Sequence, residues 1–216
     1  MTLQLTRKTL CVAGHEILIE LPASQDQLLE DALRDDGSGS SDCDPYWGAL
    51  WETAPRTAAM ILQHQLPSPL KTLELGCGIG VTGIAALIAG HNVTFSDRAS
   101  AAVDLAVSNA ALNGFSDAIG IVFDWQSPLM NTYDFILASD ILYDVVQHER
   151  LLTTLHSMLN RDGLIWIGDP GRENSLRFAE LAAMRGWCVE VLDEFAQPYP
   201  RPLHTTFRLI TIRRLR

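Results

Sequence analysis

Three glycines at alternate positions, Gly76, Gly78 and Gly80, follow an apolar run that carries a single carboxylate, Glu74. A glycine tolerates positive φ and lets the backbone approach a ligand closely, and the N-terminal end of a helix attracts groups that accept hydrogen bonds. The pattern over residues 71–80 therefore predicts a strand, a glycine-rich turn and a helix that together bind a ligand with anionic or acceptor groups.

Acidic residues also end the other predicted strands. Asp97 ends the second strand, Asp124 the third, Asp140 the fourth and Asp169 the fifth. In an open α/β sheet ligands bind beyond the carboxyl ends of the strands, and an acid about 20 residues after the first glycines accepts the ribose hydroxyls of an adenosine. We therefore expect Asp97 to bind a ribose; the alternative is that it only caps the following helix.

Two classes of cofactor fit these residues. Residues 78–83 match the dinucleotide fingerprint G-x-G-x-x-G, but the predicted strand ends before Gly76, so the match begins two residues late. Glu74 would also repel a pyrophosphate, whereas it would attract the ammonium and sulfonium groups of S-adenosylmethionine. The residues therefore favour S-adenosylmethionine over a nicotinamide dinucleotide.

The run of residues 73–80, LELGCGIG, resembles motif I of the seven-strand S-adenosylmethionine-dependent methyltransferases. Residues 45–51, 96–98 and 138–143 resemble the protein-lysine methyltransferase branch often called methyltransferase family 16, and the similarity extends over residues 44–172. The resemblance implies S-adenosylmethionine as cofactor, S-adenosylhomocysteine as product and a protein substrate that carries a target lysine. The candidate cofactor-binding residues are Trp51, Glu74, Gly76, Cys77, Gly78, Gly80, Asp97, Asp124, Trp125 and Ser139.

Asp140 and Tyr143 form the D-x-x-Y pattern of the family at the predicted end of the fourth strand. A free lysine has a pKa of about 10.4, so deprotonating it near pH 7 costs roughly 4–5 kcal/mol. Burial in an aromatic-lined slot lowers that pKa, and a carboxylate and a phenol can orient the amine and accept its proton through water. We expect both residues to be catalytic; the alternatives are a turn residue for Asp140 and a non-functional role for Tyr143. The alternative for Trp125 is a core tryptophan.

The chain that positions these residues alternates strand and helix patterns. Predicted strands lie near 71–75, 92–96, 119–124, 133–139, 163–168, 187–193 and 205–213, and predicted helices near 81–89, 99–112, 147–160 and 174–185. The near-continuous apolar runs are typical of strands covered on both faces, and the last two strands are joined without a helix. We predict an α/β fold with a Rossmann-like, doubly wound, seven-stranded sheet, mostly parallel with an antiparallel C-terminal hairpin.

Residues 1–44 are expected to form an extension and residues 45–216 the methyltransferase domain. The extension contains two β-prone runs that predict a hairpin, a capping box at Ser24 that predicts a short helix, and an acidic, Gly/Ser-rich linker over residues 35–44.

The net charge of −10 would repel nucleic-acid backbones and suits a basic protein partner. No apolar run reaches the ~18 residues that a membrane span needs, and no signal-peptide pattern follows Met1. Four cysteines without a C-x-x-C pair suit a reducing compartment and predict no metal site. We expect a soluble cytoplasmic protein that binds neither membranes nor nucleic acid; the sequence makes no prediction about oligomeric state.

Two further functions stay open at this stage. The same fold supports small-molecule N- or O-methyltransferases, because fold does not determine substrate. A non-catalytic module that binds the cofactor and acts through partners is the other alternative, although an intact motif I and D-x-x-Y pattern argue against it.

Overall fold

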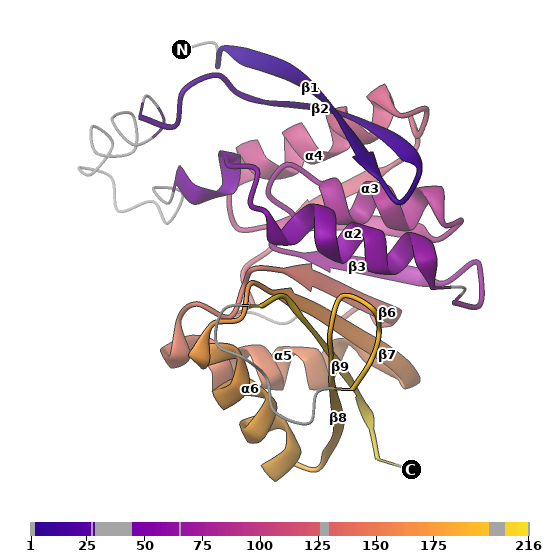
Figure 1. Cartoon of the computed structure of the whole chain (residues 1–216), viewed down its shortest axis with the longest axis vertical. Helices are drawn as coiled ribbons and strands as arrows, with labels where there is room; N and C mark the ends of the chain where they lie inside the picture. Colours follow the sequence, from indigo (N-terminus) through magenta and orange to yellow (C-terminus); the bar gives the residue numbers. More distant parts are fainter. Residues whose placement is uncertain are drawn as a thin grey trace.

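The computed structural model describes residues 3–26, 28, 45–64, 66–125, 130–198 and 206–215. An N-terminal hairpin precedes a seven-stranded sheet with helices on both faces (Figure 1). The predicted linker over residues 35–44 and most of the predicted helix after Ser24 lie outside the described residues. Within the described part of the chain, no helix combines the length and the apolar character needed to cross a membrane.

The strands of the sheet follow the order β5-β4-β3-β6-β7-β9-β8. Their bounds are Lys71–Leu75 (β3), Asn92–Asp97 (β4), Ile119–Val122 (β5), Tyr133–Ser139 (β6), Leu159–Asp169 (β7), Trp187–Leu192 (β8) and Arg208–Arg214 (β9). Strands β3 to β7 pair in parallel, and β9 runs antiparallel to both of its neighbours, β7 and β8. The predicted fold, a mostly parallel seven-stranded sheet with an antiparallel C-terminal pair, is confirmed.

Two apolar cores lie on the two faces of this sheet. Along β6, Phe135 and Leu137 belong to one core while Ile136 and Ala138 belong to the other, because successive side chains of a strand point to opposite faces. Both faces of the strand are therefore buried, which explains its continuous apolar sequence.

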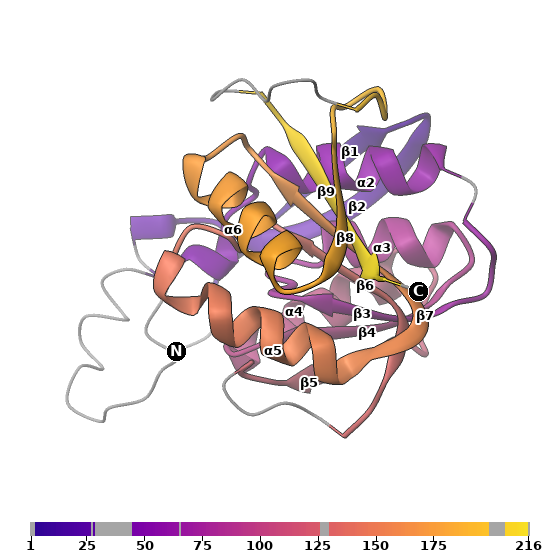
Figure 2. The ribbon, with the colours of Figure 1, turned by 90° about the horizontal axis from the view of Figure 1, so that it is seen from below.

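Helices cover each face of the sheet. Figure 1 shows α2, α3 and α4 on one side and α5 and α6 on the other, and Figure 2 shows α5 and α6 from below. Their bounds are Thr53–Gln63 (α2), Val81–Ile88 (α3), Ser100–Leu112 (α4), His148–Met158 (α5) and Glu173–Met184 (α6), with short 3₁₀ turns at Pro45–Gly48 (η2) and Val145–Gln147 (η3). The helix predicted over residues 147–160 ends at Met158 because the chain turns directly into β7 there.

The N-terminal hairpin, β1 (Leu5–Val12) and β2 (His15–Pro22), packs on α4 through two asparagine side chains. The amide of Asn113 donates to and accepts from the backbone of Leu18, and Asn109 does the same with Glu20, at 2.7–2.9 Å. These side-chain amides pair with the edge of β2 as a neighbouring strand would.

Candidate active site

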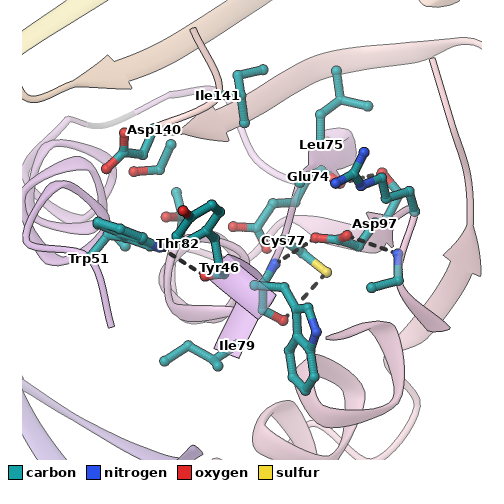
Figure 3. A pocket seen from close by; sticks show the side chains of 18 of the residues that line it. Tyr46, Trp51, Glu74, Leu75, Cys77, Ile79, Thr82, Asp97, Asp140 and Ile141 are labelled. Atoms are coloured by element: carbon teal, nitrogen blue, oxygen red, sulfur yellow. Dashed lines mark hydrogen bonds between the residues drawn. The ribbon is translucent and has the colours of Figure 1, made fainter. Parts of the chain in front are cut away.

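A cavity of about 320 Å³ lies at the carboxyl ends of β3, β4 and β6 (Figure 3). The chain runs from β3 outward through β4 to β5 on one side and then crosses back to β6 on the other side of β3, so the strand order reverses at β3. Such a switch point is where open α/β sheets bind ligands. Residues 46–51, which precede α2, form a further wall of the cavity.

The structure brings together nearly all of the residues predicted to form the site. The cavity is lined by Trp51, Glu74, Gly76, Cys77, Gly78, Asp97, Asp124, Trp125, Ser139, Asp140 and Tyr143. Gly80 does not line it. This glycine precedes α3 with φ +83°, and a Cβ there would lie 2.9 Å from the Cβ of Ala106, so its place in the structure is to let α3 and α4 pack closely.

Asp97, at the end of β4, holds the glycine turn in place. Its Oδ2 atom accepts a hydrogen bond from the amide of Gly78 at 3.1 Å, and its Oδ1 atom accepts one from the amide of Ala99 at 3.1 Å. Burial raises the pKa of Asp97, and the two backbone hydrogen bonds oppose that shift. The carboxylate thus holds the backbone just before α4, where no side chain caps the helix among the described residues, and it also lines the cavity.

Glu74, at the end of β3, carries an unusual buried carboxylate. The residue is 2% exposed, and no described residue donates a hydrogen bond to its Oε2 atom. Burial raises the pKa of Glu74 well above its ordinary value, the nearby Asp97 charge adds to the shift, and hydrogen bonding from Gly83 and Thr82 opposes it. A cationic ligand group in the cavity would offset the negative charge of this buried carboxylate.

Aromatic side chains stand at the exposed part of the cavity. The indole nitrogen of Trp51 donates to the backbone oxygen of Tyr46 at 3.0 Å, and the two rings meet edge to face at 6.1 Å. Trp51 is 42% exposed and Tyr143 is 51% exposed. Figure 3 shows Trp51 and Asp140 together on the side of the cavity away from Asp97. We call this exposed side the mouth of the cavity.

Asp140 is fixed at this mouth by contacts from three directions. Its backbone adopts φ +65°, and its amide donates to the oxygen of Gly168 at 2.8 Å. The hydroxyl of Thr53 donates to Oδ2 at 3.2 Å, and the guanidinium of Arg172 forms an ion pair with Oδ1. A non-glycine residue held at positive φ is uncommon and often marks a functional position. The carboxylate is therefore preorganised, with its side chain only 9% exposed.

Trp125 is half-buried beside the cavity, and its backbone oxygen accepts a hydrogen bond from Thr154 at 2.6 Å. Phe123, which the sequence analysis did not single out, is buried and also lines the cavity. Phe123 could have been predicted as a lining residue, because it stands immediately before Asp124 at the end of a predicted strand. Thr53 and Arg172 were missed for another reason: they lie 87 and 32 residues from Asp140 along the chain.

Among the residues that the structure describes, no group of three histidine, cysteine, aspartate or glutamate side chains is placed to bind a metal ion.

A family model described as lysine methyltransferase matches residues 44–182. The electron transfer flavoprotein beta subunit lysine methyltransferase of Danio rerio is 29% identical over 60% of this chain and 51% of that protein. The histidine protein methyltransferase 1 homolog of Dictyostelium discoideum is 32% identical over 55% of this chain and 41% of that protein. The chain thus spans about half the length of the curated relatives it matches.

Solved structures share the fold. The ribosomal protein L11 methylase from Lactobacillus delbrueckii subsp. bulgaricus superposes with a TM-score of 0.61 at 23% identity, over 78% of this chain and 81% of that chain. SMU.776, described as a putative methyltransferase complexed with SAH, gives a TM-score of 0.64 at 12% identity, over 95% of this chain and 55% of that chain. Together with the observed strand order, these likenesses confirm the predicted Rossmann-like fold.

Proposed function

The chain belongs to the lysine methyltransferase family, and from this premise we propose that it transfers a methyl group from S-adenosylmethionine to the side-chain amine of a lysine in a protein substrate. The observation that carries the proposal is Glu74, which lines the cavity with a buried carboxylate whose Oε2 atom has no hydrogen-bond partner among the described residues. When bound, S-adenosylmethionine supplies an electrophilic methyl group on a sulfonium, together with an ammonium of the kind this carboxylate needs.

The residues around the cavity fit the rest of that cofactor. Asp97 ends β4 and can accept from the ribose hydroxyls. Trp125 offers an indole face to the adenine, since a flat purine against an aromatic ring gains dispersion and excludes water. Gly76 and Gly78 leave the turn without side chains, so the backbone can approach the methionyl part. A dinucleotide fits less well because its pyrophosphate would meet Glu74 and Asp97.

The acceptor amine enters at the mouth, where Figure 3 shows Asp140 and Trp51 on the same side of the cavity; Tyr143 also lines the cavity and is exposed. In the proposed reaction the lysine Nζ lone pair forms a bond to the methyl carbon, the bond between that carbon and sulfur breaks, and the amine proton leaves to water. Asp140 is already fixed by Thr53 and can accept a hydrogen bond from the amine, which aims the lone pair. The aromatic rings partly desolvate the amine and so lower its pKa.

We also propose that residues 45–216 form the catalytic domain, with residues 1–44 as an extension. The family match over residues 44–182 supports this division. A net charge of −10 supports a basic protein partner rather than a nucleic acid.

A labelling experiment tests the proposal against its alternatives. The purified protein is incubated with methyl-tritiated S-adenosylmethionine and either the protein fraction or the small-molecule filtrate of a cell extract. We expect label in the protein fraction, lost in Asp140→Asn and kept in the surface variant Asp162→Asn. Label in the filtrate alone would indicate a small-molecule methyltransferase. Label in neither, with calorimetric binding of S-adenosylhomocysteine intact, would indicate a non-catalytic module.

A further inference from the structure

Asp140 forms an ion pair with a residue that does not itself line the cavity. The guanidinium of Arg172 lies behind Asp140 and forms an ion pair with its Oδ1 atom. The same nitrogen lies 3.6 Å from Oδ2 of Asp169, the last residue of β7, whose side chain is fully buried. One guanidinium therefore stands between two carboxylates at the ends of neighbouring strands.

The backbone of Arg172 is anchored more firmly than that of an ordinary surface loop. Its amide donates to Oδ1 of Asp169 at 2.7 Å, and its carbonyl oxygen accepts from Ser175 at 2.8 Å and from the buried Arg208 at 2.9 Å. These contacts come from the end of β7, the first turn of α6 and the start of β9. The backbone that carries the guanidinium is therefore held by the fold, and the guanidinium itself is held by its two carboxylate neighbours.

The charge of this pair bears directly on a lysine acceptor. A lysine amine attacks a methyl group only through its lone pair, so the ammonium form is unreactive. An uncompensated Asp140 would stabilise that ammonium and raise its pKa, because a charge within about 4–6 Å shifts a pKa by about 1–3 units. A cation beside Asp140 has the opposite effect while leaving the carboxylate able to accept a hydrogen bond.

Other charged or titratable groups surround the mouth and the cavity. Those that line the cavity are Tyr46 from η2, Glu74 from β3, Cys77 after β3, Asp97 from β4, Arg98 after β4, Asp124 after β5, and Tyr143 and Asp144 after β6. Asp169 from β7 and Arg208 from β9 contact Arg172, and His148 from α5 interacts electrostatically with Asp144 and Asp169. Acidic groups outnumber basic ones in this set. Arg172 forms an ion pair with Asp140, so its loss would leave that carboxylate without this cation among mostly acidic groups.

We propose that Arg172 is a positioning residue that offsets the charge of Asp140 and so keeps the bound target lysine in its neutral, reactive form. The inference rests on the proposed function and deepens it. It assigns to Arg172 no contact with the cofactor or with the reacting atoms. The ion pair also holds Oδ1 of Asp140, while Thr53 holds Oδ2, so the carboxylate presents its remaining lone pairs in a fixed direction.

The test measures how the methyl-transfer rate depends on pH in the bound complex. A protein extract from cells that lack this enzyme supplies the acceptor. Enzyme and methyl-tritiated S-adenosylmethionine are added in excess, until doubling the enzyme no longer changes the rate. The single-turnover rate constant then reports the pKa values of the bound complex. The variants are Arg172→Gln, Arg172→Lys and, as a control, Arg177→Gln, which removes an exposed ion pair with Glu173 on α6.

We expect the rate of Arg172→Gln relative to wild type to be about tenfold lower near pH 7 and to approach wild type near pH 10, as the lysine loses its proton in both proteins. Arg172→Lys keeps the charge and should restore most of the rate near pH 7. Arg177→Gln should match wild type at every pH. If the rate of Arg172→Gln relative to wild type is the same at every pH, Arg172 has a merely structural role and the inference is overturned.

A second variant keeps the test decisive if Arg172→Gln does not fold. Asp169→Asn removes a negative charge next to the same guanidinium, so its rate relative to wild type should exceed one near neutral pH and fall toward one as the pH rises. A pH-independent ratio for this variant contradicts the inference as well. Failure of the proposed function looks different, because wild type itself would then label no protein.

Discussion

The Cα of Gly78 faces the backbone carbonyl of Trp47, so closely that a Cβ on the glycine would lie 2.9 Å from that oxygen. The glycine turn after β3 and the segment before α2 therefore touch directly, although they lie about thirty residues apart in the chain. The amide of the same glycine donates to Asp97. Gly78, in the glycine turn, thus contacts both the segment before α2 and the end of β4.

Gly78→Ala should weaken binding of S-adenosylmethionine and S-adenosylhomocysteine by about 5- to 150-fold, since overpacking of this kind costs roughly 1–3 kcal/mol. Gly114→Ala is a matched control: Gly114 also has positive φ, at +90°, but a Cβ there would meet nothing within 4 Å. Calorimetry with both ligands measures the difference. Equal effects of the two substitutions would show that backbone strain, and not the contact with Trp47, limits binding. The larger Gly78→Arg substitution should block binding altogether.

Asp97→Ala should weaken the affinities for the cofactor and for its demethylated product alike, by ~1–3 kcal/mol, as expected for a lost ionic hydrogen bond. Both ligands share the ribose, so the two losses should match within error. Asp104→Ala, on the exposed side of α4, serves as the control. A loss confined to one of the two ligands would contradict ribose binding by Asp97.

Glu74→Gln should make the ligand-free protein more stable near neutral pH while weakening cofactor binding. The folded protein raises the pKa of Glu74 well above 4.5 through burial, so the folded state holds its proton more tightly than the unfolded state does. The contribution of protonated Glu74 to the stability of wild type is therefore present at acid pH. It is lost as the pH rises from about 4.5 through the pKa of Glu74 in the folded state. Glutamine cannot ionise, so the variant avoids this loss.

Urea unfolding of wild type and Glu74→Gln across pH, without ligand, measures the effect. The gap in unfolding free energy should be small at acid pH and widen toward neutral pH. If the difference in unfolding free energy between the two proteins does not change with pH, folding does not raise the pKa of Glu74.

Asp140→Asn should retain cofactor affinity while losing transfer, because Asp140 stands at the mouth and Glu74 and Asp97 hold the other side of the cavity. A single orienting and proton-accepting group contributes about 10²–10⁴-fold to a rate. Calorimetry with S-adenosylhomocysteine and single-turnover labelling measure the two properties separately. If the variant loses affinity as well as rate, the assignment of Asp140 to the acceptor side is wrong.

The strand ends of this fold could be predicted from the sequence because they follow local patterns. Apolar runs such as residues 135–138, closed by polar or acidic residues, located β3, β4 and β6, and the sheet geometry then placed Glu74, Asp97 and Asp140 around one cavity. The absence of a crossover helix before the last strand predicted the antiparallel pair.

Contacts between distant segments could not be predicted in the same way. Gly80 shares its motif with Gly76 and Gly78, but only the tertiary structure shows that it packs closely against Ala106 of α4 and does not line the cavity. The ion pair of Arg172 with Asp140 depends on the loop after β7 reaching the end of β6, and no periodic signal in the sequence encodes that approach.

The proposed activity is tested most directly by mapping the methyl group. The protein labelled by wild type, but not by Asp140→Asn, is digested and its modified residue is located by tandem mass spectrometry. We predict an added methyl group on a lysine Nζ. A methyl group on histidine, on a chain terminus or on another side chain would contradict transfer to lysine, although it would leave the proposed cofactor site intact.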